Sequence, residues 1–357
     1  MQSLTAHKEP IFGLDLLRSI AIGIVILSHT AFILQPSFPG FPYIPTPDGV
    51  DLFFVLSGFL IGTLLLQQIQ AKQNISTGIV FQFLKRRWFK TLPSYYVFLV
   101  LNLVLVSSGV LYGTINKYAI TYFAFFQNFY KSFDFFFWES WSLAVEEWFY
   151  LLFPFLLLFS HGFFKIRLKF AFLGAVLLMV ILPLIWRLHC LNIYVQHEVY
   201  FRRMVLARLD TIAFGLLAAF FHMYYPKVWY KFKYPAFITG IMLMLYLFRF
   251  GENYHPDFYK TYFGSIEAFS ILLLLPFLNS LGTEKIPLRP FRFTAKISYA
   301  MYLINLPLIL IFKPQIEKLP ATYNIAVFVA IWIGIYFVSY LWYRFFEKPV
   351  MDLRDRS

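Results

Sequence analysis

An arginine and a histidine interrupt an otherwise apolar stretch near the start of the chain, GLDLLRSIAIGIVILSHTAFIL at residues 13–34. On an α-helix, the eleven positions from Arg18 to His29 make three turns with about 20° left over, and they span about 16 Å along the axis. Both side chains therefore lie on one helix face, and Asp15 joins them three residues earlier. An imidazole suits proton transfer near neutral pH, and a guanidinium pairs with phosphate or carboxylate oxygens.

Other ionisable and polar side chains fall within apolar segments, where inserting a charge into a bilayer costs about 2.5 to 3.5 kcal/mol. That cost marks the following residues as functional candidates: Asp51, Ser57, Glu146, Glu147, Arg208, Asp210 and Glu267. If the segments pack as one bundle, His29 meets a ring of carboxylates and an arginine in the outer leaflet. We expect His29 to transfer a proton and Glu146 or Asp51 to orient its ring, as a carboxylate does in a hydrolase triad.

These residues also fit a structural role or a role in transport, instead of a role in catalysis. Taken alone, Arg18 fits a snorkelling side chain near a helix end, and His29 fits a histidine that bonds a backbone carbonyl. The histidine, arginine and carboxylates also fit the proton relay of a proton-coupled secondary transporter. The sequence shows neither repeated halves nor a matched pair of broken helices, which typify such transporters, so catalysis is favoured.

The composition is that of an integral membrane protein. Apolar residues make up 60% of the chain, charged residues only 14%, and the mean hydropathy is +0.66. Aromatic residues reach 22% and recur near the ends of apolar runs, as they do at membrane interfaces. The net charge of +13 lies in short loops rather than on one polar face, so we expect a lipid bilayer as partner and no nucleic acid.

Ten apolar segments are long enough to span a bilayer, which needs about 20 residues. They run over 14–35, 50–67, 92–112, 141–160, 168–187, 205–224, 234–250, 262–281, 297–313 and 322–346. Residues 119–130 are shorter and carry two amides, and we expect an interfacial or re-entrant piece there. Lysines and arginines gather in alternate loops, including a basic loop at 85–90, which predicts that both termini are cytoplasmic.

Several chemistries are disfavoured by what the sequence lacks. Cys190 is the single cysteine, so we expect no intramolecular disulfide, no Cys/His metal site and no bound metal. The nucleophile motif GxSxG and the zinc motif HEXXH do not occur. The first residues are unlike a cleavable signal peptide. We expect one membrane domain over residues 1–357, with no appended soluble domain.

Seven segments carry a resemblance to a known family. They are GLDLLRSIAIGIVILSH, GVDLFFVLSGFLIGTLLL, RRWFKTLPSYY, SWSLAVEEWFYLLFPFL, RLDTIAFGLLAA, ISYAMYLINLPLI and YRFFEKPV. In this order they resemble the acyltransferase-3 family of membrane O-acyltransferases. The resemblance implies a ten-helix bundle in the bacterial inner membrane. It also implies transfer of an acyl group, usually acetyl, from cytoplasmic acyl-CoA to a hydroxyl of lipopolysaccharide, peptidoglycan, exopolysaccharide or another glycan.

The resemblance also implies roles for individual residues. It assigns Arg18 and His29 to the arginine and histidine of the family's first helix, Glu146 to its helix-four glutamate, and Asp51 to the aspartate of its second segment. Acyl-CoA enters as co-substrate rather than as a permanently bound cofactor, and we expect contact with the donor from these residues: Arg18, Arg86, Arg87 and Lys90.

Two positions depart from the family pattern. Lys90 stands where many members have the second arginine of Arg-x-x-Arg, so the charge is kept but bidentate phosphate geometry is lost. Asn305 stands where many members have histidine, so no role of that histidine carries over. Two routes remain open for the acyl group: direct attack by a sugar hydroxyl that His29 deprotonates, or an acyl-histidine intermediate.

Overall fold

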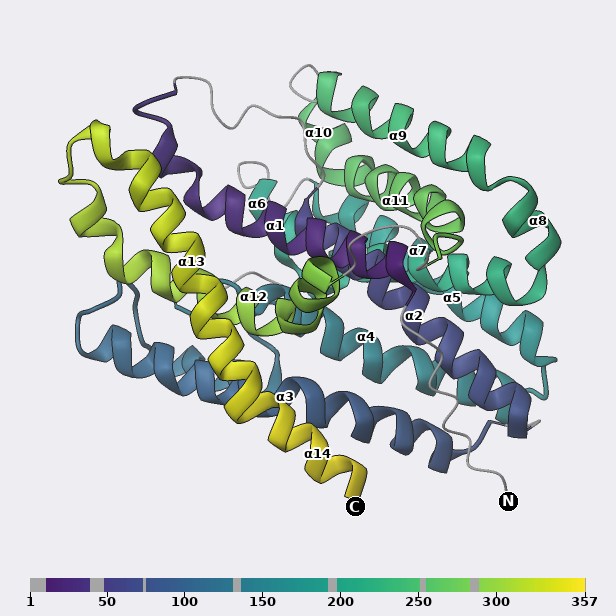
Figure 1. Cartoon of the computed structure of the whole chain (residues 1–357). Coiled ribbons are helices and arrows are strands. Elements are labelled where there is room, and N and C mark those ends of the chain that lie inside the picture. The colour runs from purple at the N-terminus through teal and green to yellow at the C-terminus, as the bar shows by residue number, and fades with distance from the viewer. Residues whose placement is uncertain are drawn as a thin grey trace.

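The computed structural model describes residues 11–38, 48–72, 75–130, 136–191, 198–250, 255–282 and 289–356, and every regular element in these ranges is a helix. The long helices are α1 (Phe12–Leu34), α2 (Gly49–Lys72), α3 (Thr77–Ser107), α4 (Ser140–Leu158), α5 (Leu168–Cys190), α7 (Val205–Tyr224), α9 (Lys233–Phe250), α11 (Gly264–Leu278), α12 (Arg289–Ile316) and α13 (Asn324–Trp342). They form one elongated bundle, with α13 at the opposite end from α9 (Figure 1). The all-helical membrane fold is confirmed.

Shorter elements connect or extend these helices. They are η1 (Lys117–Ala124), η2 (Phe159–Phe163), α6 (Glu198–Arg203), α8 (Pro226–Lys231), α10 (Pro256–Phe258), η4 (Tyr259–Phe263), η5 (Ala321–Tyr323), η6 (Tyr343–Glu347) and α14 (Lys348–Arg356). The 3₁₀ helix η1 covers eight residues, about 16 Å at 2 Å per residue, which is too short to span a bilayer. This agrees with the expectation that 119–130 does not cross.

Among the described residues, nine helices are long and apolar enough to cross a membrane. They correspond to nine of the ten predicted spans. The tenth prediction, 234–250, is the 18-residue helix α9, whose mean hydropathy is lowered by Lys233 and Arg249 at its ends. It packs against α11, as the upper part of Figure 1 shows. The chain is therefore a multi-pass membrane protein.

Two helices begin earlier than the sequence predicts. The run at 85–90 was expected in a loop, but it lies inside α3, which begins at Thr77. Likewise α12 begins at Arg289 rather than near residue 297. Lysine and arginine are good helix formers, and their long stems follow an apolar surface while the charge reaches a polar region. A prediction based on apolar length alone ends a helix where the charges begin, although the helix continues.

Close packing of α2 against α7 depends on two glycines. A Cβ atom on Gly58 would lie 2.0 Å from the Ile212 carbonyl oxygen, and one on Gly215 would lie 2.0 Å from the Val55 carbonyl oxygen. No other residue fits at either position without separating the helices. This contact fixes the rotation of α2, so one face carries Ser57 into a cavity while Asp51 contacts α7.

Some expectations fall on residues outside the described ranges. One is the expectation that residues 1–10 are unlike a cleavable signal peptide.

Candidate active site

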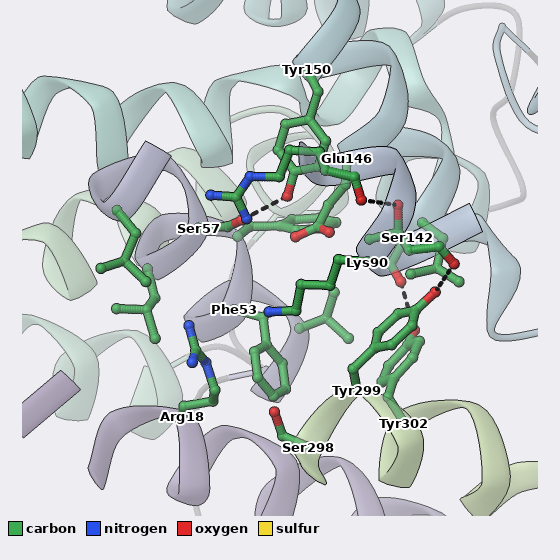
Figure 2. Close-up of a pocket in the computed structure, with 17 residues that line it drawn as sticks. Arg18, Phe53, Ser57, Lys90, Ser142, Glu146, Tyr150, Ser298, Tyr299 and Tyr302 are labelled. Carbon is green, nitrogen blue, oxygen red and sulfur yellow. Dashed lines mark hydrogen bonds between the residues drawn. The ribbon is translucent and has the colours of Figure 1, made fainter. Parts of the chain in front are cut away.

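A narrow cavity of about 110 Å³ lies where five helices, α1, α2, α3, α4 and α12, meet (Figure 2). We name it the cationic cavity. Its polar and ionisable lining residues are Arg18, Ser57, Arg87, Lys90, Thr91, Ser142, Glu146, Tyr150, Ser298, Tyr299 and Tyr302. The sequence segments that supply them are up to 284 residues apart, from Arg18 on α1 to Tyr302 on α12.

Three cationic side chains converge on this cavity. Arg18 and Lys90 reach into it from opposite sides in Figure 2, and Arg87 lies one helical turn before Lys90 on α3. In the described part of the chain, none of the three forms an ion pair within 4.0 Å. Among the described residues, Glu146 is the one carboxylate that lines the same space. Positive charge therefore exceeds negative charge here, which favours an anionic ligand.

Hydrogen bonds and a ring contact fix the walls of the cationic cavity. The Tyr150 hydroxyl lies 2.7 Å from the Ser57 hydroxyl and joins α4 to α2. The Arg87 guanidinium lies 5.6 Å from the centre of the Tyr150 ring, a cation–π contact that holds the arginine toward α4. Thr91 donates to Glu147 Oε1 at 2.7 Å, which turns that carboxylate toward α3 rather than into the cavity.

A second and larger cavity, of about 600 Å³, contains His29, and we name it the histidine cavity. It is lined from α1, α2, α4, α6, α9, η4, α11 and α12, and its ionisable residues are His29, Asp48, Glu139, Arg202, Arg203, Tyr259, Glu267 and Tyr302. A space of this size is typical of sites that enclose a small organic ligand.

The His29 ring is oriented by an amide. Its Nδ1 lies 2.5 Å from Asn305 Oδ1. The Asn305 amide nitrogen donates to two backbone carbonyls, those of Met301 at 2.9 Å and Tyr302 at 2.7 Å, so the amide oxygen must face the histidine. The oxygen can only accept, so Nδ1 carries the proton. In the neutral ring Nε2 is therefore left with a lone pair, which is what a general base or a nucleophile requires.

Asn305→Asp tests this arrangement through the pH dependence of the reaction. A carboxylate beside the ring stabilises the imidazolium, whereas catalysis needs the neutral ring. The acidic limb of the pH–rate profile should therefore move to higher pH by about one unit or more. Asn305→Leu should lower the rate without moving that limb upward. A profile that is unchanged in Asn305→Asp contradicts the role given to this amide.

An ion pair and a hydrogen bond at the edge of the histidine cavity shape its charge. Arg202 pairs with Asp48, and the Asp48 backbone N–H donates to Glu267 Oε1 at 2.8 Å. Burial raises the pKa of Asp48, yet the Arg202 guanidinium and the Val50 N–H together bring that pKa below its ordinary value. Asp48 is therefore charged at neutral pH, and its charge is matched by Arg202.

The two cavities share a wall. Val50 and Tyr302 line both of them. The Tyr302 hydroxyl donates to the Glu139 carbonyl oxygen at 3.0 Å and lies 2.6 Å from the Ser142 hydroxyl, which fixes the ring between α12 and α4. Figure 2 shows Tyr302 and Ser142 meeting at the edge of the cationic cavity.

The arrangement thus combines an anion-binding cavity with a neighbouring cavity that holds an oriented imidazole. The family model described as an acyltransferase domain matches residues 11–344. The chain belongs to the acyltransferase-3 family. No solved structure matches it significantly.

Two named proteins are similar to this acyltransferase-3 chain. The peptidoglycan O-acetyltransferase OatA of Listeria monocytogenes is 29% identical, over 95% of this chain and 55% of the relative. The O-acetyltransferase OatA of Staphylococcus aureus is 28% identical, over 95% of this chain and 57% of the relative. The chain therefore spans little more than half the length of these relatives.

The acyltransferase-3 fold separates residues that the sequence placed around His29. Of the predicted ring of carboxylates, only Glu267 lines the histidine cavity. Glu146 lies in the cationic cavity instead, and Asn305, rather than Glu146 or Asp51, contacts the His29 ring. The expected carboxylate partner of His29 was therefore wrong, because helical position alone does not fix how each helix is rotated.

Asp51, Arg208 and Asp210 belong to a buried charge cluster behind the histidine cavity. Asp51 pairs with Arg208, and Asp210 pairs with Arg187 at 2.8 Å while accepting from Ser265 at 2.5 Å. Neither aspartate lines either of the two cavities. The cluster links α2, α5, α7 and α11.

The predicted donor-contact residues divide into two groups. Arg18, Arg87 and Lys90 come together in the cationic cavity, whereas Arg86 is exposed on α3 and does not line it. Asp15 is half-buried one turn from Arg18, outside the lining, and Arg18 and Arg292 are the cations whose charges act on it. Adjacent residues on a helix differ by about 100° in direction, which explains why Arg86 and Arg87 separate.

Sequence reasoning missed several residues of the site. Glu139, Ser142, Tyr150 and Tyr302 were not singled out, and Asn305 was noted only as a departure from the family. Glu139 could have been found from the sequence, because it directly precedes the motif SWSLAVEEW and is a charged residue at the edge of a predicted span. Arg187 could have been found in the same way, because it is a charged residue at the end of the span predicted over 168–187.

Proposed function

We propose that this protein is a membrane O-acyltransferase that moves an acyl group, most simply acetyl, from cytoplasmic acyl-CoA to a hydroxyl of a cell-surface glycan. The observation that carries the proposal is the pair of adjoining cavities, one lined by three cations without an ion pair among the described residues and the other by an oriented histidine. The similar proteins named as O-acetyltransferases of peptidoglycan support this glycan as the acceptor. The proposed location is the bacterial inner membrane, with both termini cytoplasmic.

The donor is expected at the cationic cavity. Phosphate oxygens pair with guanidinium and ammonium groups, and Arg18, Arg87 and Lys90 supply three such groups against the single carboxylate of Glu146. A cavity of about 110 Å³ is too small for a nucleotide but admits a slender chain. We therefore place the phosphates at the mouth of the cavity and the pantetheine arm within it, with the thioester directed toward Tyr302.

The chemical step is assigned to His29. In the direct route, Nε2 takes the proton of the acceptor hydroxyl, the oxygen bonds to the thioester carbon, the carbon–sulfur bond breaks, and the thiolate leaves as the thiol after protonation. In the acyl-enzyme route, Nε2 bonds to the acyl carbon while the carbon–sulfur bond breaks and the thiolate leaves. The hydroxyl oxygen then bonds to the acyl carbon, the bond between Nε2 and that carbon breaks, and the proton lost by the hydroxyl balances the one that the thiolate takes up. The Asn305 contact prepares Nε2 for either role.

The proposal is tested with purified protein in proteoliposomes, supplied with acetyl-CoA that carries a radiolabelled acetyl group and with soluble peptidoglycan fragments. Transfer of label to the fragments supports the function. Label on the protein when the acceptor is omitted favours the acyl-enzyme route. If no label reaches any glycan and a solute instead moves with an imposed proton gradient, the transporter alternative replaces the proposal.

Arg18→Ala and the double variant Arg87→Ala, Lys90→Ala test the donor site. Losing a hydrogen bond to a charged group costs about 1.5 to 3 kcal/mol, so the KM for acetyl-CoA should rise about 10- to 100-fold in each. The KM for the acceptor should change less than threefold. Lys85→Ala is the matched control, because this lysine is exposed on the same helix and lies outside the cavity lining.

An unchanged KM for acetyl-CoA in both variants contradicts the donor assignment. So does a loss of the same size in Lys85→Ala, because that would show a general effect of charge along α3.

A further inference from the structure

Glu139 is a buried carboxyl in the histidine cavity for which the reaction outlined above has no use. It lies immediately before α4, is 4% exposed, and lines the cavity together with His29. Its Oε1 atom has no hydrogen-bond partner in the described part of the chain. A buried polar atom without a partner is unfavourable and calls for an explanation.

A helix cap does not explain Glu139. The residue occupies the N-cap position of α4, but its side chain makes no capping hydrogen bond, and its backbone is helical rather than extended. The contacts from Tyr302 and Ser142 go to its backbone carbonyl, not to its carboxyl group. The carboxyl group therefore does not cap this helix, and the hydrogen bond that acts on it comes from the backbone N–H of Glu139 itself.

The other carboxyl groups of the cavity differ from Glu139 because their partners belong to other residues. Asp48 pairs with Arg202 and accepts from the Val50 N–H, and Glu267 accepts from the Asp48 N–H. No described cation pairs with Glu139. Burial raises the pKa of Glu139 to about 8, so near neutral pH its carboxyl group is mostly protonated.

A protonated carboxyl group both donates and accepts a hydrogen bond. Neighbouring hydroxyls of a sugar ring, or the amide of an acetamido group, present the complementary donor and acceptor. A neutral carbohydrate ligand would also avoid placing an unpaired charge beside this buried group. The hydrogen-bonding groups of the protonated carboxyl and of the sugar are therefore complementary, and no ion pair is needed.

We propose that Glu139 binds the glycan acceptor, through hydrogen bonds from its side-chain carboxyl group to a hydroxyl or acetamido group of the sugar held beside His29. This inference rests on the proposed function and adds the residue that positions the acceptor. Glu139 acts in binding, and the proton transfer stays with His29.

The test compares Glu139→Gln with Glu139→Leu in proteoliposomes, with radiolabelled acetyl-CoA as donor and an oligosaccharide of β-1,4-linked N-acetylglucosamine as acceptor. Glutamine keeps one donor and one acceptor, whereas leucine keeps the volume without either. Glu139→Leu should raise the KM for the oligosaccharide at least 10-fold, and Glu139→Gln should stay within about threefold of wild type. The KM for acetyl-CoA should stay within twofold in both.

The other possible results separate a failure of the inference from a failure of the proposed function. If Glu139→Leu leaves the acceptor KM unchanged while wild type transfers acetyl groups, the inference fails and the proposed function stands. If Glu139→Gln loses as much as Glu139→Leu, an ionised carboxylate is required and the inference is overturned. If wild type acetylates no glycan, the proposed function fails, and the inference fails with it. Because glutamine preserves shape and polarity, its folded yield in detergent separates a binding loss from a folding defect.

Discussion

His29→Ala is expected to lower acyl transfer to glycans by about 10²- to 10⁴-fold, the range that a positioned general acid or base contributes. The structure gives two reasons for so large a loss. Nε2 is the one imidazole nitrogen left with a lone pair by the Asn305 contact, and the ring lines a cavity large enough for an acceptor. The measurement is labelled acetyl on peptidoglycan fragments at equal amounts of reconstituted protein.

His189→Ala is the matched control for this experiment. His189 is an exposed histidine at the end of α5 and lines neither cavity, so its removal should leave transfer within twofold of wild type. If an acyl-enzyme forms, the label trapped on the wild-type protein should disappear in His29→Ala. Transfer that persists at a tenth of the wild-type rate or more in His29→Ala would refute the assignment.

Arg208→Met is expected to destabilise the protein by about 3 to 5 kcal/mol. Arg208 and Asp51 form a buried pair, with side chains 5% and 1% exposed, so removing the guanidinium leaves a carboxylate buried without its counter-charge. The Asp51 Oδ2 atom already lacks a hydrogen-bond partner among the described residues, and no other cation there forms an ion pair with Asp51. The double variant Asp51→Asn, Arg208→Met should recover most of the stability, because both charges are then absent.

The measurement is the thermal midpoint of detergent-solubilised protein. Arg202→Met serves as control, because the Arg202 side chain is 44% exposed and its pair with Asp48 is expected to contribute about 1 kcal/mol or less. If Arg208→Met is no less stable than Arg202→Met, or if the double variant is as unstable as Arg208→Met, the pair does not hold α2 to α7.

The spanning helices could be predicted from the sequence because a bilayer imposes a minimum length of apolar residues, and that constraint acts within each segment. The same constraint misplaced the beginning of α3, where basic residues continue the helix toward a polar region. Helical periodicity also placed Arg18 and His29 correctly on one face of α1, since both line interior cavities.

Contacts between helices could not be predicted in this way. Whether Glu146 meets His29 or Arg18 depends on the rotation of α4, and that rotation is set by packing against neighbours distant in sequence. The approach of Gly58 to Gly215 is one such determinant, because it turns Asp51 toward Arg208 and away from His29. Asn305 lies 276 residues from His29, and no local pattern connects the two positions.

The wall formed by Val50 and Tyr302 matters for the electrical potential across the membrane. Two polar cavities that joined through the bundle would conduct protons or ions, and each elementary charge that crosses at 100 mV dissipates about 2.3 kcal/mol. Tyr302, fixed by hydrogen bonds to α4, keeps the cavities apart. The acetyl group has no net charge, so a thioester that reaches past Tyr302 delivers it to the side of His29 without discharging the membrane potential.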